Sequence, residues 1–111
     1  MSATNGTLLT LVETARKVAN LSLRHQDAVI RIEQTYRNAG RICSPLMRVD
    51  LDAMRDATSK FLFLAEALSK AIRSGEPTEG LMSLYKSSCD VFIERIESVK
   101  DHLEKHVKEF A

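Results

Sequence analysis

The sequence predicts an all-α fold, an up-down-up bundle of three long antiparallel helices in one domain. Gly and Pro are scarce, with four and two among 111 residues, and this scarcity favours a few long elements over many short ones. Apolar residues recur at alternating three- and four-residue steps in three segments of similar length, which is the periodicity of amphipathic helices. Short connections make successive helices antiparallel, so we expect a rod roughly 45–50 Å long.

The first helix is predicted over residues 7–39. Residues 1–6, which contain an Asn-Gly pair, are expected to be a disordered N-terminus, and residues 7–111 to form the domain. Ser22 and His25 interrupt the apolar series at the middle of this helix. Two alternatives therefore stay open: one continuous helix, or a break that gives a four-helix bundle. The series comprises Leu8, Leu11, Ala15, Val18, Ser22, His25, Val29, Ile32, Tyr36 and Ala39.

Local signals at the helix ends bound the other two helices. Gly40 and Gly75 are predicted to follow the ends of the first and second helices, because glycine adopts the left-handed conformation that ends many helices. Ser44 is the expected N-cap and Pro45 the expected first position of the second helix. The series are Met47, Leu51, Met54, Thr58, Phe61, Ala65, Leu68 and Ile72 over residues 45–74, and Tyr85, Cys89, Phe92, Ile96, Val99, Leu103, His106 and Phe110 over residues 78–110.

Some apolar residues do not fit a single buried stripe on each helix. In KFLFLAEAL, residues 60–68, successive side chains point about 100° apart, and Phe63 points away from the expected core. On the first helix, a second apolar set is rotated by about 110° from the main series. Isolated surface hydrophobes or a wider core are the alternatives. The predicted partner-binding residues are Val12, Ala19, Leu23, Ile30, Leu62 and Phe63.

A polar layer is expected across the middle of the bundle. Ser22, His25 and Thr58 occupy seam positions at the same height when the first two helices are antiparallel. Such groups usually hydrogen-bond to one another and fix the helix register. The alternative is a ligand pocket or a pH switch, because histidine titrates near pH ~6.5 when unperturbed.

Few residues could carry catalysis or hold a metal ion. His102 and His106 lie four residues apart on one helix face, but no third ligand is evident and the flanking residues match no zinc-protease motif. Cys43 and Cys89 are expected roughly 30 Å apart along the rod, and therefore to be free thiols. No arrangement of residues indicates nucleophilic catalysis. We predict no catalytic residues, no metal site and no cofactor.

Composition and charge limit the classes of partner. Residues 1–48 hold seven basic and three acidic side chains, and residues 49–111 hold nine and twelve, which indicates complementary helix surfaces. No aromatic residues are interleaved with the basic ones, so we expect no nucleic-acid partner. No apolar stretch approaches ~20 residues, and no signal peptide is recognisable, so we predict a cytoplasmic protein without membrane insertion. Because the first 26 residues are amphipathic and carry one acid, a mitochondrial presequence is the alternative.

Together these features predict a non-enzymatic helical interaction module, such as an adaptor, a complex subunit or a small chaperone. Its partner would be another protein or a second copy of the chain in a homodimer, with no small-molecule substrate. The alternative is a small helical sensor or ligand-binding domain that uses the polar layer of Ser22, His25 and Thr58.

Overall fold

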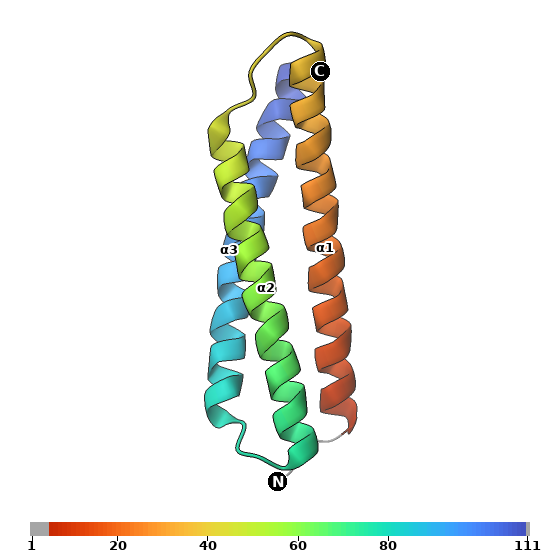
Figure 1. Ribbon diagram of the computed structural model, residues 1–111, viewed down its shortest axis with the longest axis vertical. Coiled ribbons are helices and arrows are strands. Elements are labelled where there is room, and N and C mark those ends of the chain that lie inside the picture. Colours follow the sequence, from red (N-terminus) through yellow and green to blue (C-terminus); the bar gives the residue numbers. More distant parts are fainter. Residues whose placement is uncertain (1–4, 111) are drawn as a thin grey trace.

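The structure of the chain, a computed structural model that describes residues 5–110, is a bundle of three helices. They are α1 (Asn5–Asn38), α2 (Pro45–Ser74) and α3 (Glu79–Phe110). α1 and α3 run in the same direction and α2 runs against them (Figure 1), so the predicted all-α three-helix bundle is confirmed. The rod measures 59 × 20 × 16 Å and is longer than predicted because the loops extend beyond the helix ends.

α1 is continuous through Ser22 and His25, so the alternative of a break and a four-helix bundle does not occur. The helix begins at Asn5, two residues before the predicted start, and therefore includes the end of the segment expected to be disordered. Residues 1–4 of that segment lie outside the described part of the chain. A serine hydroxyl does not break a helix, because Ser22 finds hydrogen-bond partners without disturbing the backbone ladder.

Both inter-helix loops begin with the same capping motif. Gly40 and Gly75 have φ values of 69° and 70°, in the left-handed region, as the sequence predicts. The Gly75 amide donates to the Ile72 carbonyl, and the next amide donates to the Ala71 carbonyl, which is the Schellman pattern. At the start of α2, the Ser44 hydroxyl accepts from the Leu46 amide at 3.3 Å.

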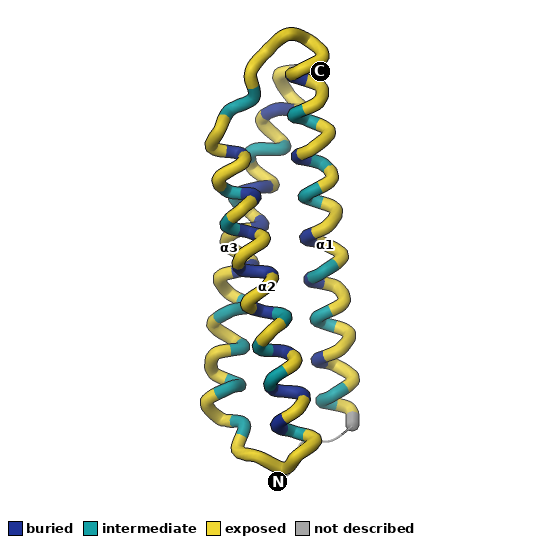
Figure 2. The backbone as a smooth tube through the Cα atoms, viewed as in Figure 1, coloured by how far each residue is buried: buried dark blue, intermediate teal, exposed yellow. Residues whose placement is uncertain are grey.

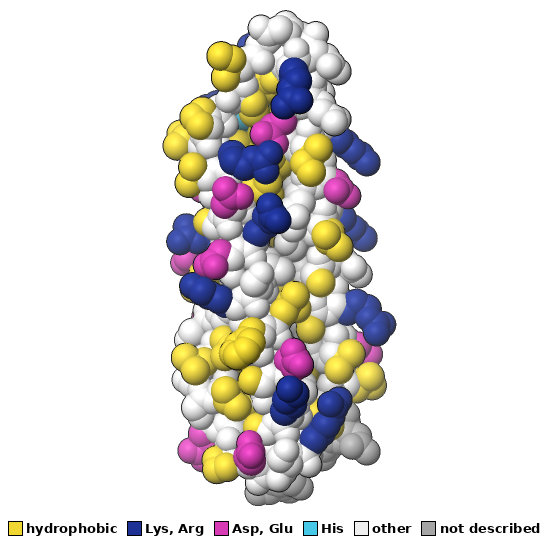
Figure 3. Space-filling view, in the orientation of Figure 1, with side chains coloured by type: hydrophobic (Ala, Val, Ile, Leu, Met, Phe, Trp, Pro, Cys, Tyr) yellow, Lys and Arg dark blue, Asp and Glu magenta, His cyan; other side chains and the backbone are white. Residues whose placement is uncertain are grey.

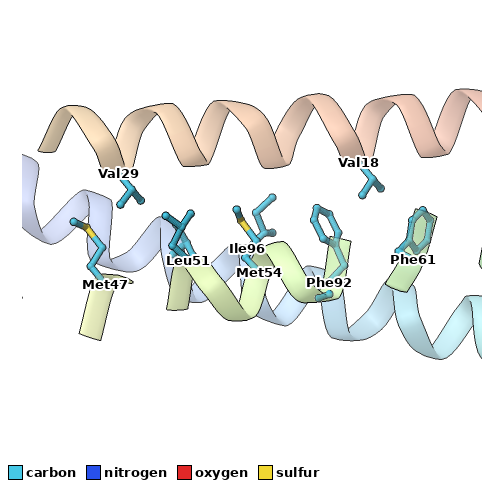
Figure 4. Packing of buried hydrophobic residues seen from close by; sticks show 10 residues of the cluster. Val18, Val29, Met47, Leu51, Met54, Phe61, Phe92 and Ile96 are labelled. Carbon is cyan, nitrogen blue, oxygen red and sulfur yellow. The ribbon is translucent and has the colours of Figure 1, made fainter. Parts of the chain in front are cut away.

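The core lies along the axis where the three helices meet, and buried residues mark the inner stripe of each helix (Figure 2). Figure 4 shows the valines of α1 pointing toward side chains from α2 and α3. α2 lies at the centre of the packing, since it contacts α3 most extensively and α1 next, whereas α1 and α3 contact each other least. The core cluster comprises Val18, Val29, Met47, Leu51, Met54, Ala57, Phe61, Phe92, Ile96 and Val99.

Phe61 is the largest fully buried side chain of this core. Its ring centroid lies 4.9 Å from that of Tyr85 and 6.4 Å from that of Phe92, both on α3. These aromatic contacts pack α2 against α3 and determine which residues of the two helices are exposed to solvent. Within residues 5–110, no helix carries a stretch long and apolar enough for a membrane crossing.

Candidate functional site

An open apolar groove runs between α2 and α3 on the outside of the bundle, with a volume of about 580 Å³. Phe63 lies at its edge with 70% of its surface exposed. Leu84 and Val91 from α3 are 56% and 43% exposed and line the opposite side. Figure 3 shows hydrophobic side chains along the length of the rod, with one group over the lower half of this face. The lining residues, which we call the α2–α3 groove, are Ala57, Ser59, Lys60, Phe63, Leu64, Leu84, Ser87, Ser88 and Val91.

Helix geometry explains why these side chains stay outside the core. Phe61 points into the core, and Phe63 follows two residues later, rotated by about 200°. Leu64 lies between the two directions and is half-buried. Burying one large apolar side chain contributes about 1.5–3 kcal/mol, so a continuous set of exposed apolar residues marks a surface that a partner can cover.

A second groove, between α1 and α2, separates the predicted partner-binding residues into two surfaces. Val12 lines this groove together with Leu62, whereas Phe63 lines the α2–α3 groove. Leu62 is half-buried and packs against the core cluster, so most of its surface is already covered within the chain. Leu62 and Phe63, both predicted to bind a partner, therefore lie on different surfaces, because the two side chains point about 100° apart and face different neighbours.

The remaining predicted partner-binding residues lie along α1. Leu23 and Ile30 are exposed, as is Val12, and Ala19 is half-buried. The α1–α2 groove is smaller, about 290 Å³, and carries charged residues along one wall, namely Glu66, Lys70 and Arg73. Of the two grooves, the one between α2 and α3 is larger and more uniformly apolar.

Ser22 and Thr58 meet in the interior at the middle of the bundle. Both are buried, and their hydroxyl oxygens lie 3.1 Å apart. Thr58 Oγ1 also lies 2.8 Å from the Met54 carbonyl oxygen, and Gln26 Nε2 donates to Ser22 Oγ at 3.2 Å. These contacts satisfy the buried hydroxyl groups within the protein and favour a structural role for the pair.

His25 does not belong to this layer, contrary to the prediction. Its ring nitrogen Nδ1 lies 2.9 Å from the carbonyl oxygen of Leu21 on its own helix, and the side chain is half-exposed. The buried stripe of α1 is narrow because α1 contacts α3 little, so a residue about 60° from Ser22 lies at its edge. Gln26, which is not among the residues predicted for this layer, makes the hydrogen bond to Ser22 expected of His25.

His102 and His106 turn to different partners. His102 Nε2 lies 2.8 Å from Asp50 Oδ2, and the same carboxylate oxygen accepts from the Ser98 hydroxyl at 2.6 Å. His106 is buried at the end of the bundle, where Nδ1 contacts the Tyr36 hydroxyl. Among residues 5–110, no group of three or more His, Cys, Asp or Glu side chains is arranged to hold a metal ion.

The second polar cluster joins the last turns of α1 and α3. The Tyr36 hydroxyl donates to Glu109 and contacts His106, whose Nδ1 lies 3.5 Å from Glu109 Oε2. The hydrogen bond to Glu109, together with burial, raises the pKa of Tyr36 to about 12. The same hydrogen bond lowers the pKa of Glu109. Arg41 lies 5.3 Å from the centre of the Tyr36 ring, in a cation–π contact.

His106 retains one buried atom without a partner. Its Nε2 makes no hydrogen bond to any residue in the described part of the chain. Because the single proton of the Tyr36 hydroxyl goes to Glu109, Nδ1 of His106 carries the hydrogen that it shares with that hydroxyl oxygen. This arrangement ties α1 to α3 and leaves the tyrosine protonated, so it serves as a clamp between helix ends.

Cys43 and Cys89 are free thiols. Burial raises the pKa of both, which lowers the fraction present as reactive thiolate.

Leu84 and Val91, which form the α3 side of the groove, are not among the predicted partner-binding residues. Their spacing of seven residues places them on one helix face, and this spacing could have indicated an apolar stripe on α3.

Comparisons with protein-family models, with curated protein sequences and with solved structures returned no match to this chain.

Proposed function

We propose that this protein is a non-enzymatic helical interaction module that receives a helix of its partner in the α2–α3 groove. The observation that carries the proposal is the exposure of Phe63 beside a groove lined largely by apolar side chains. Aromatic residues at the edge of an apolar groove are frequent anchors of helix-to-helix binding. Its role would be that of an adaptor, a complex subunit or a small chaperone.

The shape of the groove favours an elongated partner. Two antiparallel helices form its walls, and the groove is open along its length rather than enclosed. A helix laid into it would place apolar residues at i, i+3, i+4 and i+7 against Leu64, Leu84 and Val91. The other lining residues are Ser59, Lys60, Ser87 and Ser88, which could hydrogen-bond to a partner beside the apolar contact.

The proposal is tested by a photo-reactive phenylalanine analogue at position 63. Illumination in extract of the source cells is expected to join the 12.5 kDa chain to one defined protein, which mass spectrometry then identifies. The matched control carries the same analogue at Lys100, an exposed position about 180° from Val91 around α3. Equal products from the two positions, or none from position 63, would contradict the proposal.

A second variant separates binding from folding. Because Phe63 is mostly exposed, Phe63→Ser is expected to change the free energy of unfolding by less than about 0.5 kcal/mol. The same change is expected to abolish association, measured by sedimentation equilibrium. A loss of several kcal/mol in stability would show that Phe63 belongs to the fold rather than to a binding surface.

A further inference from the structure

We infer that the occupant of the α2–α3 groove is a second copy of this chain, paired antiparallel about a twofold axis at the level of Phe63. The inference rests on the proposed function, because it names the partner for the same groove. It is carried by the apolar face around Phe63 together with the order of charges on the outer face of α2.

The outer face of α2 is centred on Phe63. Asp56 lies seven residues before it and Lys70 seven residues after it, and two helical turns return each to within about 20° of the Phe63 direction. Both charged side chains are exposed. The line along the outside of α2 is therefore an acid, an aromatic ring and a base, about 10.5 Å apart.

Because of this order, the outer face of α2 is complementary to the same face of a second copy only when the two helices are antiparallel. When two copies of α2 lie antiparallel with Phe63 beside Phe63, Asp56 of each copy comes opposite Lys70 of the other. Parallel alignment would instead oppose acid to acid and base to base, which is unfavourable. A twofold dimer requires this kind of self-complementary patch. If one residue of the first copy contacts a second residue of the partner, the same contact must occur again with the two copies exchanged.

The existing ion pairs do not prevent this contact. Asp56 lies 3.1 Å from Lys60 and Lys70 lies 3.7 Å from Glu66, each within α2. Such exposed pairs one turn apart are weak, and a carboxylate has two oxygens. Asp56 can therefore keep Lys60 while it accepts from Lys70 of the second copy.

The same pairing covers the apolar groove. α3 lies beside α2, so bringing the two α2 helices together also brings the two α3 helices to the same interface. Leu84 and Val91 of both copies then face the partner along with Phe63. One arrangement thus accounts for both the exposed apolar residues and the charge order.

The test uses charge reversal. Asp56→Lys and Lys70→Glu are each expected to weaken self-association at least tenfold in sedimentation equilibrium, because each opposes like charges twice. An equimolar mixture of the two variants is expected to dimerise, since all charged contacts between unlike chains are then attractive. The double variant Asp56→Lys, Lys70→Glu is expected to recover a homodimer. Lys100→Glu, on the other side of α3, is expected to associate as the wild type does.

Each outcome decides between the explanations. Both single variants place like charges one turn apart within α2, beside Lys60 or Glu66, and this local defect persists in the mixture. Rescue in the mixture therefore cannot come from repaired helix stability, which circular dichroism monitors separately. Single variants that associate like the wild type, or a mixture that stays monomeric, would overturn the inference. A monomeric wild type whose position 63 crosslinks to a different protein overturns it while the proposed function stands, and no crosslink at all removes both.

Discussion

Tyr36 is a single residue that joins the ends of two helices. α1 and α3 run in the same direction, so their last turns lie level, and Tyr36 reaches His106 and Glu109. The ordinary pKa of tyrosine is about 10, whereas that of Tyr36 is raised to about 12. The Tyr36 hydroxyl therefore stays protonated to a higher pH in the folded state than in the unfolded state. The resulting stabilisation is present below about pH 10 and is lost as the pH rises toward 12.

A spectrophotometric titration tests this assignment. The chain has two tyrosines, so in the Tyr85→Phe background the absorbance at 295 nm reports Tyr36 alone. We expect a midpoint near 12, and a clearly lower midpoint after Glu109→Gln, because the carboxylate of Glu109 is the main cause of the raised pKa. A midpoint of about 10 in the folded protein would contradict the hydrogen bond.

The Ser22 and Thr58 hydroxyls give a second prediction at this scale. Ser22→Ala and Thr58→Val are each expected to lower the free energy of unfolding by about 0.5–1.5 kcal/mol, since each removes a buried hydrogen-bond partner. The double variant is expected to lose less than the sum, because no unpaired hydroxyl remains at the contact. Urea titrations of the four proteins measure the difference, and strict additivity would show that the two groups do not interact.

At the scale of the elements, the helix ends could be predicted closely from the sequence. The second helix was predicted over residues 45–74 and the structure has Pro45–Ser74, because Ser44, Pro45 and Gly75 encode both ends locally. The third helix begins one residue later than predicted, at Glu79, and Thr78 still accepts from the Met82 amide. The start of α1 differs more, since the structure has Asn5 where the sequence predicts residue 7.

Glycine substitutions test the local encoding of the helix ends. Gly80 lies in the first turn of α3 with open space around the position of a Cβ atom, so Gly80→Ala is expected to add about 0.5–1 kcal/mol to the stability. Gly75→Ala also meets no atoms but must hold φ near 70°, so it is expected to cost about 1–2 kcal/mol. Thermal unfolding of both variants provides the comparison, and changes of the same sign would contradict this explanation.

The rotation of each helix about its axis could not be predicted with the same accuracy. Periodicity indicated that Phe63 faces outward, and it is mostly exposed. The same reasoning grouped Leu62 with Phe63 and placed His25 in the core. In the structure both placements differ by about 60–100° around the helix axis, and such rotations depend on which neighbouring helix lies closest. That information resides in the packing of the three helices against one another, which involves residues far apart in sequence.

At the scale of the whole molecule, the packing is unequal. α2 contacts both neighbours, whereas α1 meets the others along one narrow buried stripe. Tyr36 and His106 illustrate what this arrangement adds, since they are 70 residues apart in sequence and in contact at one end of the rod. Their meeting required the relative height of α1 and α3, which no local signal specifies.

Hydrogen exchange tests the unequal packing. Amides of α2 around Met54 and Phe61 are expected to exchange only through global unfolding, because these residues are fully buried between two helices. Amides at the middle of α1 are expected to exchange through a smaller opening, at a lower free energy. Mass spectrometry of peptides from exchange at low denaturant measures both, and equal protection of α1 and α2 would contradict the prediction.

The two ends of the rod are unlike. One end carries the first loop and the clamp of Tyr36, His106 and Glu109, and the other carries the turn at Gly75. In an antiparallel dimer this difference between the ends would disappear, because each end of the dimer would carry the clamp of one copy and the Gly75 turn of the other. Such a dimer has no head or tail, because its twofold axis exchanges the two copies end for end.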